Sequence, residues 1–544
     1  MSSSRYPVVP AALIAAAFAL GVFATAAFGA AKPLRVVPAA PHPGASGTLG
    51  PAARHALDQG YLVPDPGAYE RAKAKAARAA RRGASAGAAA LAAPLSRQLA
   101  PATVGSWSGL DDEDFAPSDS TSAVGTKRFI ELVNSQFAIY GKGSVTPIST
   151  GSLNTLANTS TADALFDVQV IWDPTTSRFY YTMIDVVSNA QNRLAYGYSK
   201  TASPSSGSGS DWCRYSINYG NRFPDFPKLG DSRYYALIGV NVFSGNFFTG
   251  ADALAINKPS GSACQSHPKL KVRSDLTSHG STPAFSPVPA NEIDAKKTGW
   301  IAAIPSRLPS SKISLFKVKK KNGEAKIQKT STPLKVNRYA EPAQAPQSGN
   351  STKIDTLDAR LTQAVAATDP GHNGKFTIWT QHAVAGGAGS MVRWYEIHPF
   401  EPKLIQHGSI SSGSQYTFDG AISPNRAVKG STKSGGKNMV MNFVTSSGSS
   451  FPAIEMVSKK KGSGQTNPVV VKQSPGPIAG FDCAPFPGEP LICRWGDYAA
   501  ATPDPSASSR IWNVSQWASG SDPPCTTLAN CPATWRTQIF IAKP

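Results

Sequence analysis

The segment Asp167-Val-Gln-Val-Ile-Trp172, followed by Asp173-Pro174 and then by Arg178-Phe-Tyr-Tyr-Thr182, decides the fold of this chain. An Asp opens a short apolar run, an Asp-Pro turn follows, and a second apolar run begins at a basic residue. Short runs rich in β-branched and aromatic residues, separated by a turn signal, are typical of antiparallel strands. We therefore interpret this stretch as the first two strands of a sheet.

The same pattern starts again along the chain. Five further segments begin at an Asp residue: Asp119, Asp225, Asp358, Asp419 and Asp497. A seventh unit starts near residue 283 and has no leading Asp. A recurrence of roughly 50–80 residues built from short strands indicates radial or stacked sheets. We predict an all-β fold, a single β-propeller of about seven blades with four antiparallel strands each. Six or eight blades, or an elongated stack, are the alternatives.

The last unit shows only three clear strands, which end near residue 542. A circular array must close, because an open blade leaves an exposed edge. The segment 102–107 is the candidate for the missing strand, so the propeller is expected over residues 105–544.

The N-terminal region has a different composition. Arg5 precedes an uncharged apolar stretch, and we interpret residues 1–31 as a signal peptide or an N-terminal membrane anchor. Residues 32–104 are rich in Ala and Pro and are expected to be a basic linker. A marginal helix is predicted over 68–82, with no large apolar face to hold it by packing.

The six cysteines agree with export, because an even number in an exported protein favours disulfides. Short loops favour two pairs, Cys483–Cys493 and Cys525–Cys531, which leaves Cys213–Cys264; this is one of 15 pairings. No Cys-x2-Cys motif occurs and the eight His residues are scattered, so zinc binding is not indicated. His372 and His382 are expected in surface or loop positions.

The chain of 544 residues carries a formal charge of +20, concentrated in the runs 71–82, 317–329 and 459–461. No nucleic-acid motif accompanies this charge. Either these runs are solvated loops, or they contact acidic wall polymers or anionic lipid outside the cell. We expect a monomer, extracellular or attached to the cell surface.

Three stretches carry a family resemblance: 123–134, 212–227 and Arg494-Trp-Gly-Asp-Tyr498. They resemble a family of secreted bacterial β-propellers near the sialidase-like (neuraminidase-like) fold, over about residues 105–544. The resemblance implies export and a propeller but no activity, because fold does not carry function. The sialidase turn motif Ser-x-Asp-x-Gly-x-Thr-Trp is not intact, and no catalytic residue can be transferred.

The leading Asp residues are the strongest candidate site, because inner strands of a propeller line its central channel. A ring of carboxylates needs compensation by backbone N–H groups, by Arg360 and Arg494, or by a bound Ca²⁺. No other cofactor is indicated. Aromatic residues near the same mouth would suit a glycan, or they pack between blades. The predicted ligand-binding residues are Asp119, Asp167, Asp225, Asp358, Arg360, Asp419, Arg494, Trp495 and Asp497.

Three functions follow as hypotheses. The first is a non-enzymatic propeller that binds a partner or ligand, an extracellular glycan or wall polymer. The second is a sialidase-like glycoside hydrolase using channel carboxylates, which would need two acids at the separation that hydrolysis requires. The third is a structural cell-wall protein attached through its basic N-terminal spacer.

Overall fold

The computed structural model describes residues 33–41, 62–86, 100–188, 190–428, 435–483, 491–520 and 532–544. The predicted signal segment 1–31 and the predicted Cys525–Cys531 bridge lie outside these residues. Residues 34–544 form one compact unit. Within the described residues, no helix is both long enough and apolar enough to span a bilayer.

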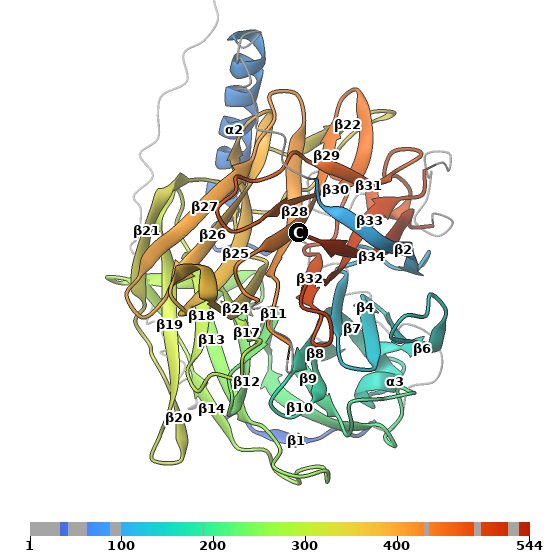
Figure 1. Ribbon diagram of the computed structural model, residues 1–544, viewed down its shortest axis with the longest axis vertical. Coiled ribbons are helices and arrows are strands. Elements are labelled where there is room, and N and C mark those ends of the chain that lie inside the picture. Colours follow the sequence, from blue (N-terminus) through green and yellow to red (C-terminus); the bar gives the residue numbers. More distant parts are fainter. Residues whose placement is uncertain are drawn as a thin grey trace, which may run out of the picture. The chain divides into compact units, whose positions relative to one another are not determined.

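The described strands form seven blades that follow one another in sequence order around a common axis (Figure 1). Blade 1 contains β3 (Thr121–Val124), β4 (Arg128–Val133), β5 (Gln136–Gly141) and β6 (Pro147–Ser152). Blade 2 contains β7 (Ala164–Asp173), β8 (Arg178–Ser188), β9 (Gln191–Ser199) and β10 (Trp212–Gly220). Blade 3 contains β11 (Arg222–Asp231), β12 (Tyr235–Ser244), β13 (Phe247–Asn257) and β14 (Leu270–Arg273). These boundaries confirm the four strands predicted for the blade that starts at Asp167.

The remaining blades vary this pattern. Blade 4 contains β15 (Thr277–His279), β16 (Thr282–Pro289), β18 (Gly299–Pro305), β19 (Ser310–Lys321), β20 (Glu324–Ile327) and β21 (Thr332–Tyr339). Blade 5 contains β24 (Gln363–Asp369), β25 (Lys375–Gly386), β26 (Gly389–His398) and β27 (Lys403–Ile410), with β17 (Asn291–Glu292) parallel to β24. Blade 6 contains β28 (Tyr416–Pro424), β29 (Met439–Ser447), β30 (Ser450–Lys459) and β31 (Val469–Gln473).

Blade 7 joins the two ends of the propeller. Its three C-terminal strands are β32 (Ala500–Pro503), β33 (Ile511–Ala518) and β34 (Trp535–Lys543), and its fourth strand is β2 (Ala102–Asp111). Strand β2 pairs antiparallel with β34, so Trp107 lies opposite Ile539. The predicted closure by the segment 102–107 is therefore confirmed, and it covers an edge that would otherwise expose unpaired backbone groups.

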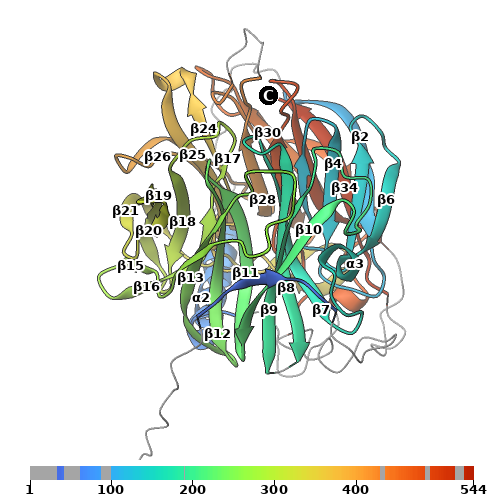
Figure 2. The same ribbon diagram turned by 90° about the horizontal axis from the view of Figure 1, so that it is seen from below.

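A few elements lie outside the blades. Strand β1 (Val36–Pro38) adds a fifth strand to blade 2 by pairing with β10 (Figure 2). The hairpin of β22 (Ala345–Gln347) and β23 (Asn350–Ile354) stands alone as a two-stranded sheet. The helices are α2 (Pro66–Ala86), α3 (Leu153–Ala157) and the short 3-10 turns η1 (Pro370–His372) and η2 (Phe481–Cys483).

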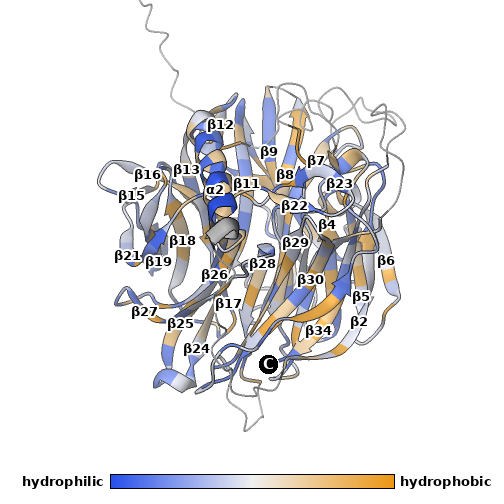
Figure 3. Cartoon of the chain, turned by 90° about the horizontal axis from the view of Figure 1, so that it is seen from above, coloured by the Kyte–Doolittle hydropathy of each residue, from blue (hydrophilic) through white to orange (hydrophobic). Residues whose placement is uncertain are grey.

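Helix α2 packs more closely than its composition predicts. Its outer face is hydrophilic (Figure 3), but the side chain of Lys73 is only 5% exposed. The Lys73 ammonium donates to Thr356 Oγ1 at 3.0 Å and to the Leu357 carbonyl oxygen. The expected linker therefore contains a helix that one buried cation attaches to blade 5.

Two of the predicted disulfides are present. Cys213–Cys264 joins β10 to the loop after β13, and Cys483–Cys493 closes a loop before blade 7. The first bridge spans 51 residues and the second spans 10.

Buried ion pairs connect neighbouring blades near the turns that follow their first strands. Lys258, directly after β13, is 2.8 Å from Asp173 Oδ1 of blade 2 and 2.8 Å from Asp231 Oδ2 of its own blade. Lys142, directly after β5, is 2.5 Å from Asp504 Oδ1 of blade 7. A lysine that follows a third strand thus reaches the Asp residue at the end of the first strand in the preceding blade.

We predict that Lys258→Met lowers stability by about 3–5 kcal/mol, because it leaves two buried carboxylates without their cation. The measurement is denaturant unfolding. The control Lys271→Met, on the exposed side of β14, is expected to stay within about 0.5 kcal/mol of the wild type.

The triple variant Lys258→Met/Asp173→Asn/Asp231→Asn separates charge from packing. It should be more stable than Lys258→Met alone, because no unpaired buried charge remains. If the single variant is as stable as the wild type, the ion pairs do not contribute to holding the blades together.

Candidate functional site

The innermost strands share a distortion that explains why an Asp recurs there. Asp119, Asp167 and Asp419 have positive φ angles of 42°, 54° and 44°. In blades 3 and 4 the corresponding residues are Phe226 and Ser286, with φ angles of 52° and 50°. Strands β7, β11, β16 and β28 each shift register at this point, which is the signature of a β-bulge. Asp tolerates the left-handed region better than most residues do, and a bulge redirects its side chain.

These side chains connect one blade to the next through hydrogen bonds. The Asp119 carboxylate accepts from the backbone N–H of Asp497 in the approach to blade 7, at 2.6 Å. The Asp167 carboxylate accepts from the backbone N–H of Phe226 in blade 3, at 3.0 Å. Asn134 donates to Asp119 Oδ2 and accepts from the backbone N–H of Asp167. Backbone groups that the bulges free are thereby satisfied without water.

The predicted acids do come together around the axis. Asp225 accepts from Asn241 at 3.2 Å, and Asp419 accepts from the indole N–H of Trp495 at 3.2 Å. Arg494 donates to Asp497 Oδ1 at 3.3 Å. The carboxylates interact with one another across the ring: Asp167 with Asp119, Asp225 and Asp497, Asp225 with Asp358, and Asp419 with Asp119 and Asp497. We call these six residues and their cations the acidic ring.

Arg360 is the main cation at one side of the acidic ring. Its guanidinium binds Asp358 in a bidentate manner, at 2.8 and 2.9 Å, and lies 4.0 Å from Asp225 Oδ2. It also packs over the ring of Phe285, 4.9 Å from the ring centroid. Both predicted arginines therefore pair with ring carboxylates, which is one of the compensations expected from the sequence.

Lys228 is a member of the ring that the sequence pattern did not reveal. It is buried in β11, and its ammonium lies 3.0 Å from the ring centroid of Tyr498 and 4.2 Å from that of Phe226. Burial lowers the pKa of Lys228 well below its usual range, while Asp167, Asp119 and Asp497 oppose that shift. A lysine three residues after a leading Asp, at a strand position with the opposite orientation, could have been the signal.

Burial is the largest cause of the raised pKa values in the acidic ring. It raises the pKa of Asp497 to about 7, with Asp119 adding to the shift, and the pKa of Asp419 to about 8. Burial and neighbouring carboxylates also raise the pKa values of Asp119 and Asp167. Six carboxylates face Arg360, Arg494 and Lys228. Burial raises the pKa of five of these acids, and neighbouring carboxylates add to the shift: Asp119, Asp167, Asp225, Asp419 and Asp497.

The axis beside the acidic ring is almost filled. The cavity lined by inner-strand residues, Lys228 and Gln169 among them, has a volume of only about 20 Å³, enough for one water. Of the six aromatic residues expected near this mouth, four are at most 1% exposed, namely Phe226, Phe418, Trp495 and Tyr498, whereas Phe166 and Tyr416 are partly buried. These rings pack between blades, which was the second interpretation of the sequence.

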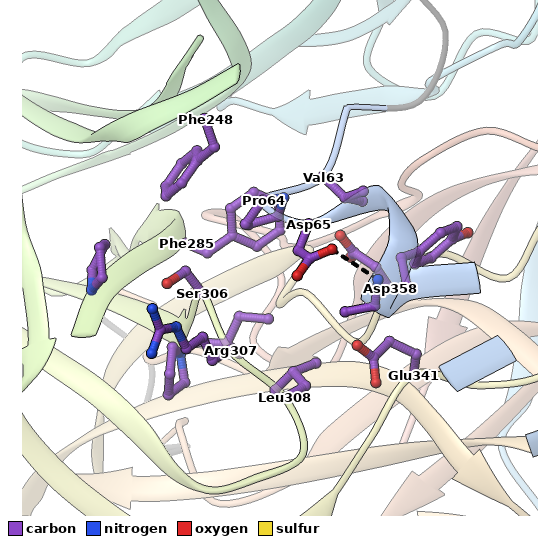
Figure 4. Close-up of a pocket in the computed structure, with 15 residues that line it drawn as sticks. Val63, Pro64, Asp65, Phe248, Phe285, Ser306, Arg307, Leu308, Glu341 and Asp358 are labelled. Carbon is purple, nitrogen blue, oxygen red and sulfur yellow. Dashed lines mark hydrogen bonds between the residues drawn. The ribbon is translucent and has the colours of Figure 1, made fainter. Parts of the chain in front are cut away.

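A larger accessible space lies at the edge of the ring, next to Asp358. A pocket of about 440 Å³ opens between the start of α2 and the turns of blades 3 to 5 (Figure 4). Phe248 and Phe285 line one side and the carboxylates of Asp65, Asp358 and Glu341 line another. Of the predicted site residues, Asp358 alone lines this pocket, and Arg360 supports it through the Asp358 pair and the Phe285 ring.

The buried histidine in blade 5 corrects an expectation. His382 lies inside β25 and is 0% exposed, whereas the sequence suggested a surface or loop position. Its Nδ1 pairs with the Ala359 carbonyl oxygen at 2.9 Å and its Nε2 with Tyr395 Oη at 3.0 Å. Burial lowers the pKa of His382 to about 3, so the imidazole is neutral, and its hydrogen bond holds the turn before β24, where Ala359 has a positive φ of 71°.

Comparison with known proteins shows no family for this chain. No family model matches the chain, and no curated protein matches its sequence. A mutant of the Synechocystis apocarotenoid oxygenase is 10% identical over 65% of this chain and 71% of its own, with a TM-score of 0.37. Drosophila Plexin A in complex with Semaphorin 1b is 7% identical over 82% of this chain and 87% of its own, with a TM-score of 0.33.

A third structure, an alpha-L-arabinofuranosidase from Lactobacillus brevis, is 11% identical over 69% of this chain and 89% of its own, with a TM-score of 0.27. Because these TM-scores are low, the likenesses carry no argument about activity. The chain is a β-propeller on the evidence of its own sheets.

The ring predicts a specific dependence of stability on pH. A carboxyl group whose folded pKa is raised stabilises the fold below its unfolded pKa and loses that contribution as the pH rises through the folded value. For Asp419 the loss extends from about pH 4 to about pH 8. The variant Asp419→Asn mimics the protonated acid. Its melting temperature should therefore fall less than that of the wild type when the pH is raised from 5 to 8.5.

Thermal unfolding at both pH values measures this difference. The control Asp114→Asn replaces an exposed acid and should follow the wild-type curve. An Asp419→Asn curve parallel to that of the wild type would show that Asp419 stays ionised in the folded protein.

Proposed function

We propose that this chain is a non-enzymatic binding protein whose pocket beside α2 takes a glycan. The observation that carries the proposal is Glu341, which is 8% exposed and lines the pocket. Its Oε2 atom has no hydrogen-bond partner. A buried carboxylate oxygen without a donor is costly, and a ligand hydroxyl would remove that cost.

The shape and lining of the pocket support the same chemistry. Its volume of about 440 Å³ falls in the range of small-molecule sites, which combine apolar walls with a few polar groups. Phe248 offers an aromatic face to the C–H face of a sugar, and the acids accept from its hydroxyls. Arg307, on the opposite side, can donate to a ring or carboxylate oxygen (Figure 4).

The covalent structure supports an extracellular site of action. Two disulfides form within the described residues, and disulfides persist in oxidising compartments. Secretion, membership of the sialidase-like family, binding to a wall polymer and a monomeric state remain part of this proposal. The basic runs on the surface would favour acidic members of the glycan class.

Glu341→Gln and Phe248→Ala test the pocket. We expect the purified protein to bind one or a few glycans on an array, and each variant to weaken the best of them by about tenfold, since a buried contact contributes about 1–3 kcal/mol. The matched controls are Glu324→Gln, an exposed acid of β20, and Phe247→Ala, whose side chain is 80% exposed next to Phe248.

Isothermal titration with the best glycan gives the affinities, and a hydrolysis assay runs on the same samples. Equal binding by all four variants would place the glycan elsewhere. If the wild-type protein hydrolyses the glycan and the Glu341→Gln variant does not, that result would contradict the non-enzymatic proposal and favour a glycoside hydrolase.

A further inference from the structure

A second cluster of polar side chains lies in blade 5, away from the acidic ring and the pocket. Asp369 ends β24, and its side chain accepts from the backbone N–H of Gly371 to begin η1. His372 lies within that turn, and its Nδ1 contacts Asp369 Oδ2. Glu396 projects from β26, two strands away. One nitrogen or oxygen atom of each residue lies within 4.8 Å of the corresponding atoms of the other two.

The two carboxylates of this cluster are deeply buried. Asp369 is 1% exposed and Glu396 is 0% exposed, whereas the His372 side chain is 41% exposed. Glu396 Oε2 accepts from Gln406 at 2.7 Å, but Glu396 Oε1 has no hydrogen-bond partner. Two buried acids that face each other repel, and each needs a proton or a cation.

At two other blade boundaries, a lysine pairs with the Asp residue that corresponds to Asp369. Lys142 and Lys258 follow the third strands of blades 1 and 3, and each neutralises the Asp at the end of the first strand in the preceding blade. In blade 6 the equivalent lysine is Lys459, at the end of β30. Among the described residues it forms no ion pair with Asp369 or Glu396, although it is close enough to interact with both charges.

We propose that Asp369, His372 and Glu396 bind a divalent transition-metal ion of the Zn²⁺ class between blades 5 and 6. The ion would replace the lysine that ties other blades together. It would supply positive charge to both carboxylates and a partner to Glu396 Oε1. The exposed side of His372 provides a route for the ion from solvent.

The donor set favours Zn²⁺ over the hard cations. One imidazole nitrogen and two carboxylate oxygens are ordinary zinc ligands, and three protein ligands leave a fourth position for water. Ca²⁺ takes six to eight oxygen ligands, and Mg²⁺ keeps several waters in octahedral geometry. Neither preference fits a small buried cluster that contains an imidazole.

Titration of Zn²⁺ into the metal-free full chain, purified without a histidine tag, tests the site. We expect one bound ion per chain and a rise in melting temperature on saturation, since an ion that binds the folded state stabilises it. His372→Ala and Glu396→Gln should weaken binding by more than tenfold, because even residues that only support a metal ligand contribute that much. Because His372 is partly exposed, its variant should fold without difficulty.

Two controls locate the ion. His407→Ala removes an exposed imidazole from β27 of the same blade and should bind Zn²⁺ as the wild type does. Lys459→Met removes the nearby competing charge and should bind more tightly. No saturable binding by the wild type, equal binding by His372→Ala, or an unchanged affinity in Lys459→Met would each overturn the proposal.

Co²⁺ gives an independent readout. Its absorption bands report nitrogen and oxygen ligands directly, and they should appear in the wild type and in His407→Ala but not in His372→Ala. Bands that persist in His372→Ala would place the metal at another site and would also overturn the proposal.

Discussion

The structure depends on buried side chains that satisfy backbone groups of the neighbouring blade. At the bulges of β7 and β11, the backbone N–H groups of Asp167 and Phe226 have no ladder partner, and Asn134 and Asp167 accept them across the blade boundaries. Asp119 accepts the backbone N–H of Asp497 in the approach to blade 7. An unsatisfied buried amide would cost about as much as a lost hydrogen bond. The main role of the recurring Asp is therefore to connect neighbouring blades.

This structural role decides what the centre of the propeller can do. The acids are paired with backbone groups, with Arg360 and Arg494, or with one another, and the aromatic rings close the remaining space. The space along the axis admits about one water. Larger spaces open away from the axis, and one of them is the pocket at the edge of the ring beside Asp358. Helix α2 forms one wall of that opening, because Lys73 holds it against blade 5.

Charge is balanced differently at the centre and near the outer turns. At the centre, burial and mutual repulsion raise the pKa values of Asp419 and Asp497. Near the turns, Lys142 and Lys258 provide full charges at short distance. Blade 5 departs from that rule, since Asp369 and Glu396 face each other with an imidazole beside them. A departure from a repeated structural solution is the feature that singles out this cluster.

The sequence by itself determined the repeat, the strands and the closure. Each blade is a local unit in which alternating apolar residues, a turn and a basic residue specify strands within about 50 residues, and segment 102–107 was the obvious partner for an incomplete last blade. The convergence of the six acids followed from the same regularity, whereas the two disulfides followed from the number and spacing of the cysteines.

Only the tertiary structure decided which of these residues are accessible. Lys228 lies among the acids of the ring, and Glu341 lines the pocket at its edge beside helix α2, which Lys73 holds in place. Asp369, His372 and Glu396 meet across strands that are not adjacent in sequence. The sequence pattern does not predict these contacts, because they depend on bulges and on the packing of one blade against the next. The sequence could therefore place the acids in a ring, while the distinction between buried structural contacts and an open pocket required the packed fold.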